Sequence, residues 1–216
     1  MRTFFKMNLP NKLTTLRMVA VLVVIAIALI PWNGINGTGI EAWLYASMAN
    51  KNIEWVRYTL CGLFIVASFT DMLDGKIARN YNLVTTYGKF MDPIADKLLV
   101  NSMFMILTFW GLVPIGVLLV VICRDIIVDA IRMIMCEKNV VVPANIFGKL
   151  KTVIQMIAIP FVLVYSLIFP KIASSFPLDI ILCYVAAIAS FLSGVIYFMQ
   201  SKDVVLDGAT TKGENK

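Results

Sequence analysis

The chain has 216 residues, of which 60% are hydrophobic and only 15% are charged. Its mean hydropathy of +0.85 and its long uncharged runs are typical of a polytopic helical membrane protein, and nothing in the composition indicates a separate soluble domain. The net charge is +6, but Lys and Arg are distributed over several loops instead of one stripe, so we expect no nucleic-acid binding. The absence of histidine excludes His-based catalysis and His metal ligands.

Six apolar segments predict an all-α integral membrane protein with six transmembrane helices. In chain order, the expected spans are residues 13–32, 54–80, 93–110, 114–137, 147–169 and 178–201, preceded by a short N-terminal interfacial helix at 6–12. The first span lacks a small-residue cleavage site, so we expect it to be retained. Residues 1–201 would then form one membrane domain, followed by a polar C-terminal tail at 202–216.

The basic residues lie mainly on one side of these spans. Segments 1–17, 75–97, 124–151 and 202–216 hold 4, 4, 5 and 3 of them, which is 16 of the 19 in the chain. Because Lys- and Arg-rich loops remain in the cytoplasm, we expect both termini on the cytoplasmic side of the cell membrane. Asp92 and Asp96 lie within segment 75–97, and Asp71 and Asp74 lie just before it, so we expect this cluster of carboxylates to face the cytoplasm as well.

The third and fourth spans are too short to cross a membrane without their flanking charges. Residues 98–123 carry no charge, and Gly111 and Pro114 predict a tight turn between two arms of about 13 residues each. Such an arm is ~20 Å long, against a hydrocarbon core of ~30 Å. Both helices must therefore bring charged residues below the membrane surface, which is tolerable around a water-filled cavity.

Four carboxylates within 26 residues mark the candidate site. Asp71 and Asp74 are three apart, and Asp92 and Asp96 are four apart, so each pair projects from one face of a helix. Two such faces brought together would form an all-oxygen pocket suited to Mg²⁺. An alternative for one member is that Asp92, followed by Pro93, merely caps the third helix.

This segment resembles the signature of the CDP-alcohol phosphotransferase family at every fixed position. The pattern is Asp-x-x-Asp-Gly-x-x-Ala-Arg, eight residues, Gly, three residues, Asp, three residues, Asp. The matching residues are Asp71, Asp74, Gly75, Ala78, Arg79, Gly88, Asp92 and Asp96. The resemblance implies transfer of a phosphatidyl group from a CDP-lipid to an alcohol with release of CMP. It also implies one or two Mg²⁺ or Mn²⁺ ions and a six-helix homodimer with a cytosol-facing cavity.

The resemblance also assigns roles to these residues. Asp96 would be the general base that takes the proton of the attacking hydroxyl. The metal ligands would be Asp71, Asp74, Asp92 and Asp96. The CDP-lipid would be bound by Asp71, Gly75, Ala78, Arg79 and Gly88.

Within the family, the chain resembles phosphatidylglycerophosphate synthases along nearly its whole length, notably at residues 8–17, 82–97 and 148–156. The donor would then be CDP-diacylglycerol, and the acceptor sn-glycerol 3-phosphate, a dianion that Arg forks suit. The candidate acceptor-phosphate residues are Arg124, Arg132, Lys149 and Lys151. We favour Arg124, since the hairpin places it beside the third span. The alternative is that these residues set topology or contact lipid headgroups.

Other functions remain as alternatives. The same chemistry would serve an inositol phosphate, serine or phosphatidylglycerol as acceptor, although the basic residues disfavour serine. Outside the family, intramembrane acids also mark cation transporters, but we find no internal repeat of the kind transporters usually show. Intramembrane prenyltransferases also bind lipid diphosphates through Asp pairs, but their acidic elements are usually spaced differently.

Overall fold

The computed structural model describes residues 9–35, 39–80, 86–137 and 146–210. Within these ranges it describes no side chains for residues 9–10, 71–80, 86–90, 93, 146–147, 174 and 203–210. The described chain is mostly helical and contains no strand. Its long helices are α2 (Leu9–Leu29), α4 (Glu54–Asn80), α5 (Thr86–Phe109), α6 (Ile115–Glu137), α7 (Ile146–Ile168) and α9 (Leu178–Thr210). Shorter elements are α3 (Ile40–Met48), η1 (Ala49–Asn52) and α8 (Pro170–Ser175).

The six predicted helices are all present, and several of their ends differ from the prediction. The bounds of α4 agree with the prediction, α6 begins one residue later than predicted, and α7 is shifted by one residue at both ends. Helix α5 begins at Thr86 instead of at 93, so the alternative that Asp92 caps this helix is wrong. Proline has a fixed φ that is compatible with a helix, and the single backbone bond that Pro93 cannot donate does not end the helix here.

The last helix is longer than we predicted. We expected it to end at 201, where the polar tail begins, but α9 continues to Thr210. This segment contains no proline that would end the helix. The expected interfacial helix at 6–12 falls partly outside the described residues, and its last four positions belong to α2.

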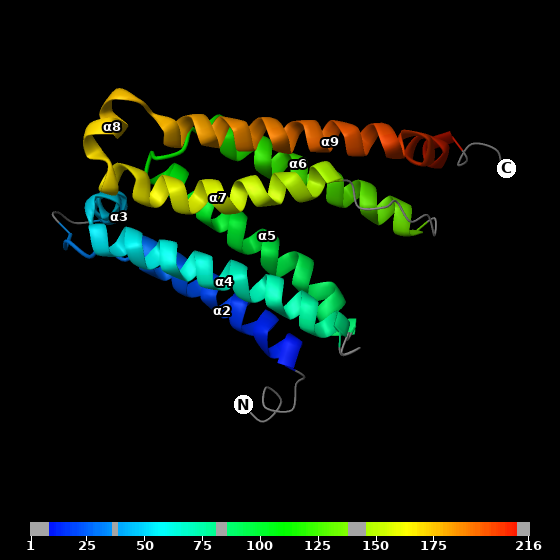
Figure 1. Ribbon diagram of the computed structural model, residues 1–216, viewed down its shortest axis with the longest axis horizontal. Coiled ribbons are helices and arrows are strands. Elements are labelled where there is room, and N and C mark those ends of the chain that lie inside the picture. Colours follow the sequence, from blue (N-terminus) through cyan, green and yellow to red (C-terminus); the bar gives the residue numbers. More distant parts are fainter. Residues whose placement is uncertain (1–8, 36–38, 81–85, 138–145, 211–216) are drawn as a thin grey trace.

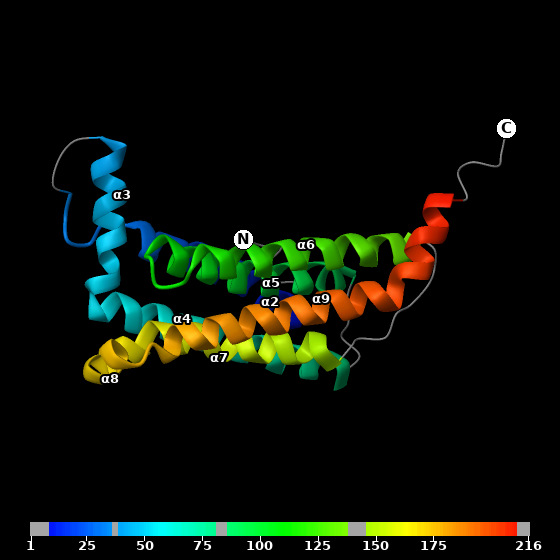
Figure 2. The same cartoon turned by 90° about the horizontal axis from the view of Figure 1, so that it is seen from above.

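The long helices form two groups that lie side by side (Figure 1). One group contains α2, α4 and α5, and the other contains α6, α7 and α9; α4 contacts α7, and α5 contacts both α6 and α7. The beginnings of α5 and α7 and the ends of α4, α6 and α9 lie at one end of the bundle, as Figures 1 and 2 agree. Helices α3 and α8 lie at the other end, so the basic segments meet at one end of the molecule.

Only some of the described helices have the length and composition of a membrane span by themselves. Helices α2, α7 and α9 do. A fourth span arises if Ile40–Asn52 and Glu54–Thr70, which meet at a bend of 78°, are counted as one. Charged residues interrupt α5 and α6, as the length argument predicted. The described residues therefore support three or four of the six expected spans.

Helix α5 is the central element of the bundle. One of its faces is completely covered, at Leu99, Met103, Phe104 and Leu107, and Trp110, directly after the helix, is buried as well. The predicted turn after this face is a Schellman motif, in which the backbone N–H of Gly111 bonds Thr108 and that of Leu112 bonds Leu107. Gly111 has a φ of 71°, which favours glycine. This turn fixes α6 against α5, and the charged ends of both helices then lie together.

Asn50 in η1 closes the opposite end of the bundle. Its fully buried side chain donates hydrogen bonds to the carbonyl oxygens of Ala28, at 2.9 Å, and Ile30, at 2.7 Å. Its carboxamide oxygen accepts a bond from the backbone N–H of Trp32. Because the last carbonyl groups of a helix have no partner within it, Asn50 acts as a C-terminal cap for α2.

Replacing Asn50 with Ala should lower the free energy of unfolding by about 2–3 kcal/mol, since two buried carbonyl groups lose their donor. The matched control is Asn52→Ala, a change at an exposed position of the same short helix, which should stay within about 0.5 kcal/mol of the parent. Thermal unfolding of the purified protein in detergent measures both. Equal destabilisation by the two substitutions would contradict the capping role.

Candidate functional site

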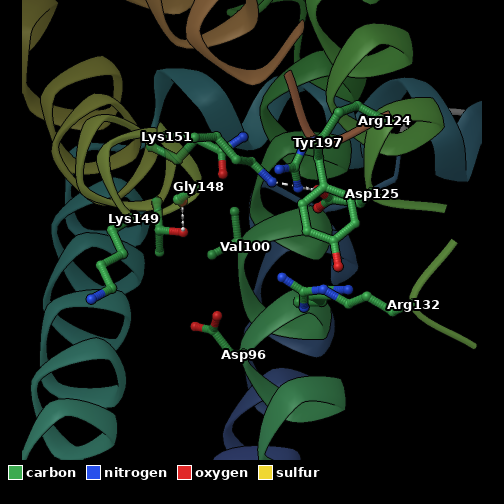
Figure 3. A pocket seen from close by; sticks show the side chains of 12 residues that line it. Asp96, Val100, Arg124, Asp125, Arg132, Gly148, Lys149, Lys151 and Tyr197 are labelled. Carbon is green, nitrogen blue, oxygen red and sulfur yellow. Dashed lines mark hydrogen bonds and ion pairs between the residues drawn. The ribbon is translucent and has the colours of Figure 1, made fainter. Parts of the chain in front are cut away.

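A cavity of about 250 Å³ lies where the two helix groups meet, between α5, α6, α7 and α9. It lies toward the end of the bundle that holds the basic segments. Twelve side chains line it, nine of which are labelled in Figure 3. They are Asp96, Lys97 and Val100 from α5, Arg124, Asp125 and Arg132 from α6, Gly148, Lys149, Lys151, Thr152 and Gln155 from α7, and Tyr197 from α9.

The cavity brings together residues that we predicted separately. The predicted base, Asp96, lines the same cavity as all four predicted acceptor-phosphate residues, which are Arg124, Arg132, Lys149 and Lys151. With Lys97, the lining contains five cationic side chains and two carboxylates. Since cations exceed carboxylates in a confined space, the cavity is suited to an anionic ligand.

The carboxylate of Asp125 connects two of these cations. The guanidinium of Arg124 donates a hydrogen bond to Asp125 Oδ1 at 3.0 Å, and the ammonium group of Lys151 donates to the same oxygen. The side chains of Asp125 and Lys151 are each only 7% exposed. Figure 3 shows Lys151 extending from α7 toward Asp125 on α6. The cluster therefore links two helices and retains one excess positive charge beside the cavity.

Helix α9 holds the side chain of Arg124 from the other side. Ser193 accepts a hydrogen bond from Arg124 Nη2 at 2.6 Å. The next residue is Gly194, and a Cβ atom there would lie only 2.8 Å from Arg124 Cγ. Glycine thus lets the arginine side chain pass closely over α9, and its guanidinium is directed between Asp125 and Ser193.

Two further contacts fix side chains around the cavity. Lys97, adjacent to Asp96 in the sequence, forms an ion pair with Asp129 on α6, so α5 and α6 are joined near the predicted base. The guanidinium of Arg132 lies 5.5 Å from the ring centroid of Tyr197, a cation–π contact between α6 and α9.

The rest of the predicted metal and CDP-lipid site lies on α4 and α5. Asp92 accepts a hydrogen bond of 2.5 Å from the hydroxyl of Thr14 on α2. The structure describes the backbone but not the side chains at the other predicted positions, which are Asp71, Asp74, Gly75, Ala78, Arg79 and Gly88. Among the side chains that are described, no three acidic or Cys residues are grouped to hold a metal ion. Asp71 and Asp74 are not among these described side chains.

Sequence reasoning did not assign several residues of the site. Lys97, Gln155 and Tyr197 line the cavity, and Ser193 orients Arg124. The sequence feature that could have indicated two of these residues is their helical spacing. Gln155 follows Lys151 by four residues, and Tyr197 follows Ser193 by four, so each pair shares a helix face. Such spacings also occur in ordinary packing faces and do not identify a site by themselves.

Comparison with known proteins agrees with the signature. The profile of the family described as CDP-alcohol phosphatidyltransferase matches residues 7–195. The chain belongs to the CDP-alcohol phosphatidyltransferase family. Eleven of the twelve residues that line the cavity fall within the matched range, and Tyr197 lies just beyond it. The cavity is thus part of the family domain.

Several relatives align with most of the chain. A CDP-diacylglycerol–glycerol-3-phosphate 3-phosphatidyltransferase of Bacillus subtilis (strain 168) is 36% identical over 90% of this chain and 95% of its own length. A protein of the same name from Rickettsia typhi is 34% identical over 90% of this chain and 97% of its own. Another, from Mycoplasma pneumoniae, is 36% identical over 70% of this chain and 66% of its own.

Replacing Asp125 with Asn should lower the free energy of unfolding by about 3–5 kcal/mol, because Arg124 and Lys151 would lose their common counter-charge in a buried place. The matched control is Asp129→Asn, the same substitution one turn along α6. Asp129 forms an ion pair with Lys97, and the two side chains are 44% and 30% exposed, respectively. Loss of this exposed ion pair should lower the free energy of unfolding by about 1 kcal/mol or less. Thermal unfolding in detergent compares the two variants.

A double variant tests the charge argument directly. Adding Lys151→Met to Asp125→Asn removes the uncompensated ammonium group, so part of the lost stability should return. Strictly additive losses would contradict the proposed coupling of the two residues.

Proposed function

We propose that this protein transfers the phosphatidyl group of CDP-diacylglycerol to sn-glycerol 3-phosphate, giving phosphatidylglycerophosphate and CMP. The observation that carries the proposal is that the carboxylate of Asp96 lines one cavity together with five cationic side chains. Relatives that align over 90% of the chain and are named for these two substrates support it.

In this reaction, the cationic side chains would bind the phosphate of the acceptor. Arg124 is held by Asp125 and Ser193, so its guanidinium is already oriented before the substrate arrives. Lys151, Lys149 and Arg132 line the same cavity. A serine acceptor carries no phosphate and does not need such a cluster, whereas an inositol phosphate would fit it as well as glycerol phosphate. The names of the relatives favour glycerol 3-phosphate over an inositol phosphate.

Asp96 would act as the general base. Its carboxylate takes the proton of the acceptor's terminal hydroxyl while that oxygen attacks the phosphorus atom that carries diacylglycerol. The bond from this phosphorus to the CMP oxygen breaks, and CMP leaves. A carboxylate is suited to this role because the chain offers no histidine.

The donor set also fits a hard divalent cation. Asp71 and Asp74, near the end of α4, and Asp92 and Asp96, near the beginning of α5, would hold one or two Mg²⁺ or Mn²⁺ ions. Oxygen ligands are those that such ions prefer. A bound ion would neutralise charge on the diphosphate of the donor. The resemblance to the family signature implies that the CDP-lipid is bound by Asp71, Gly75, Ala78, Arg79 and Gly88.

We further infer the membrane arrangement. All six long helices would cross the cell membrane, with both termini and the cavity on the cytoplasmic side, where the basic segments favour it. The exposed apolar side chains of the outer helix faces suit contact with membrane lipids. The protein would act as a homodimer, as its family resemblance implies.

The deciding experiment is release of CMP from CDP-diacylglycerol by the purified protein with Mg²⁺. The acceptors to compare are glycerol 3-phosphate, inositol phosphate, serine and phosphatidylglycerol. We expect release with glycerol 3-phosphate, and none without an acceptor or in the presence of a metal chelator. Release only with another acceptor would overturn the acceptor assignment, and no release with any acceptor would overturn the proposed reaction.

Replacing Asp96 with Asn should reduce turnover at least about 100-fold, because the amide cannot accept the hydroxyl proton. Binding of CDP-diacylglycerol, measured directly, should be largely retained. The matched control is Asp179→Asn in the first turn of α9, at the opposite end of the bundle, which should turn over like the parent. A parent-like rate for the Asp96 variant would remove this residue as the base.

A further inference from the structure

Gln155 on α7 is a buried amide that faces the cavity. Its side chain is only 2% exposed, and it is one of the residues that line the cavity. Its amide nitrogen Nε2 has no hydrogen-bond partner among the described residues. A buried donor without a partner is costly, and native proteins retain few of them without a functional reason.

The position of Gln155 places this amide at the inner end of the cavity. Among the lining residues, Val100 on α5, Arg124 on α6 and Gln155 on α7 lie farthest along their helices from the end that carries the basic segments. Gln155 follows Lys151 by one turn on the same face of α7. Val100 is apolar, so Arg124 and Gln155 supply the polar groups at this inner end.

The two polar groups differ in chemistry. Arg124, like the other cations of the lining, donates hydrogen bonds and attracts negative charge, which suits a phosphate. The carboxamide of Gln155 is neutral and carries both donors and an acceptor, which suits a hydroxyl group, since a hydroxyl also both donates and accepts. Glycerol 3-phosphate carries one hydroxyl, at C2, that takes no part in the proposed reaction.

We propose that Gln155 hydrogen-bonds the C2 hydroxyl of the acceptor and thereby makes the enzyme select a polyol phosphate. This inference rests on the proposed function. It assigns Gln155 to recognition of the acceptor and not to the reacting atoms. A bound C2 hydroxyl would also restrict the rotation of the acceptor, so that its terminal hydroxyl is directed to Asp96.

A substrate analogue and a substitution together test this contact. The monophosphate of propane-1,3-diol retains the phosphate and the terminal hydroxyl of the acceptor but lacks the C2 hydroxyl. For the parent protein, kcat/KM should be higher with glycerol 3-phosphate than with this analogue. In Gln155→Leu, kcat/KM for glycerol 3-phosphate should fall roughly tenfold or more, whereas the value for the analogue should change less than about twofold. KM for CDP-diacylglycerol should be unchanged.

Stability separates recognition from a packing role. Leu is close to Gln in size and has no amide to leave unpartnered, so Gln155→Leu should have a Tm equal to or above that of the parent. The matched control uses the only other glutamine of the chain, Gln200, which is exposed on α9. Gln200→Leu should change neither kcat/KM, for glycerol 3-phosphate or for the analogue, nor the Tm. Arg124→Ala provides the contrast, since loss of a phosphate contact should lower kcat/KM for both acceptors alike.

The other outcomes contradict either the role of Gln155 or the proposed function. Equal losses with glycerol 3-phosphate and the analogue would remove the C2 hydroxyl as the partner of Gln155, and a lowered Tm with parallel losses would make the residue structural. If Gln155→Leu does not fold, Gln155→Met, which also lacks the amide, is tested against the same criteria. Failure of the parent protein to use glycerol 3-phosphate would instead overturn the proposed function, and the inference with it.

Discussion

The cavity depends on one carboxylate that serves two cations. Asp125 accepts hydrogen bonds from Arg124 and Lys151, and the cluster is almost completely removed from solvent. Burying three charges is costly unless each is paired, so this arrangement holds α6 and α7 in a single relative position. Because two positive charges share one negative charge, the cluster is also electropositive. The same contact therefore supplies both rigidity and the attraction for an anion.

Close approach of α9 makes the arrangement complete. In a helix without Gly194, a Cβ atom would occupy the space of the Arg124 side chain, whose Cγ lies 2.8 Å from that position. An arginine displaced from this position would lose its hydrogen bonds to Asp125 and Ser193, and an unpaired charge in a buried place is costly. Ser193 then provides the second acceptor for the guanidinium. Neighbouring residues on α9 thus supply the space and the hydrogen bond that orient an arginine of α6.

Sequence patterns predicted the helices well and the contacts between them poorly. The length of the uncharged stretch and the turn at Gly111 were sufficient to predict the bounds of α6, and hydropathy was sufficient to predict those of α4 and α7 to within one residue. The Asp92–Pro93 pair misplaced the start of α5, since proline is compatible with a first turn and also with a helix interior. The basic residues of the cavity were predicted, but their partners were not. Asp125 and Lys151 are 26 residues apart and Arg124 and Ser193 are 69 apart, and no local pattern specifies such pairings.

The division of charge between the two helix groups suits a reaction between two anions. The carboxylates of the signature belong to α4 and α5, whereas four of the five cations of the cavity come from α6 and α7. In the proposed reaction the donor carries a diphosphate and the acceptor a phosphate, so the two substrates repel each other. A metal held by one helix group and cations held by the other would neutralise each substrate separately. Asp96 belongs to the first group but lines the same cavity as the cations of the second, so the proposed base would lie where the two substrates are expected to meet.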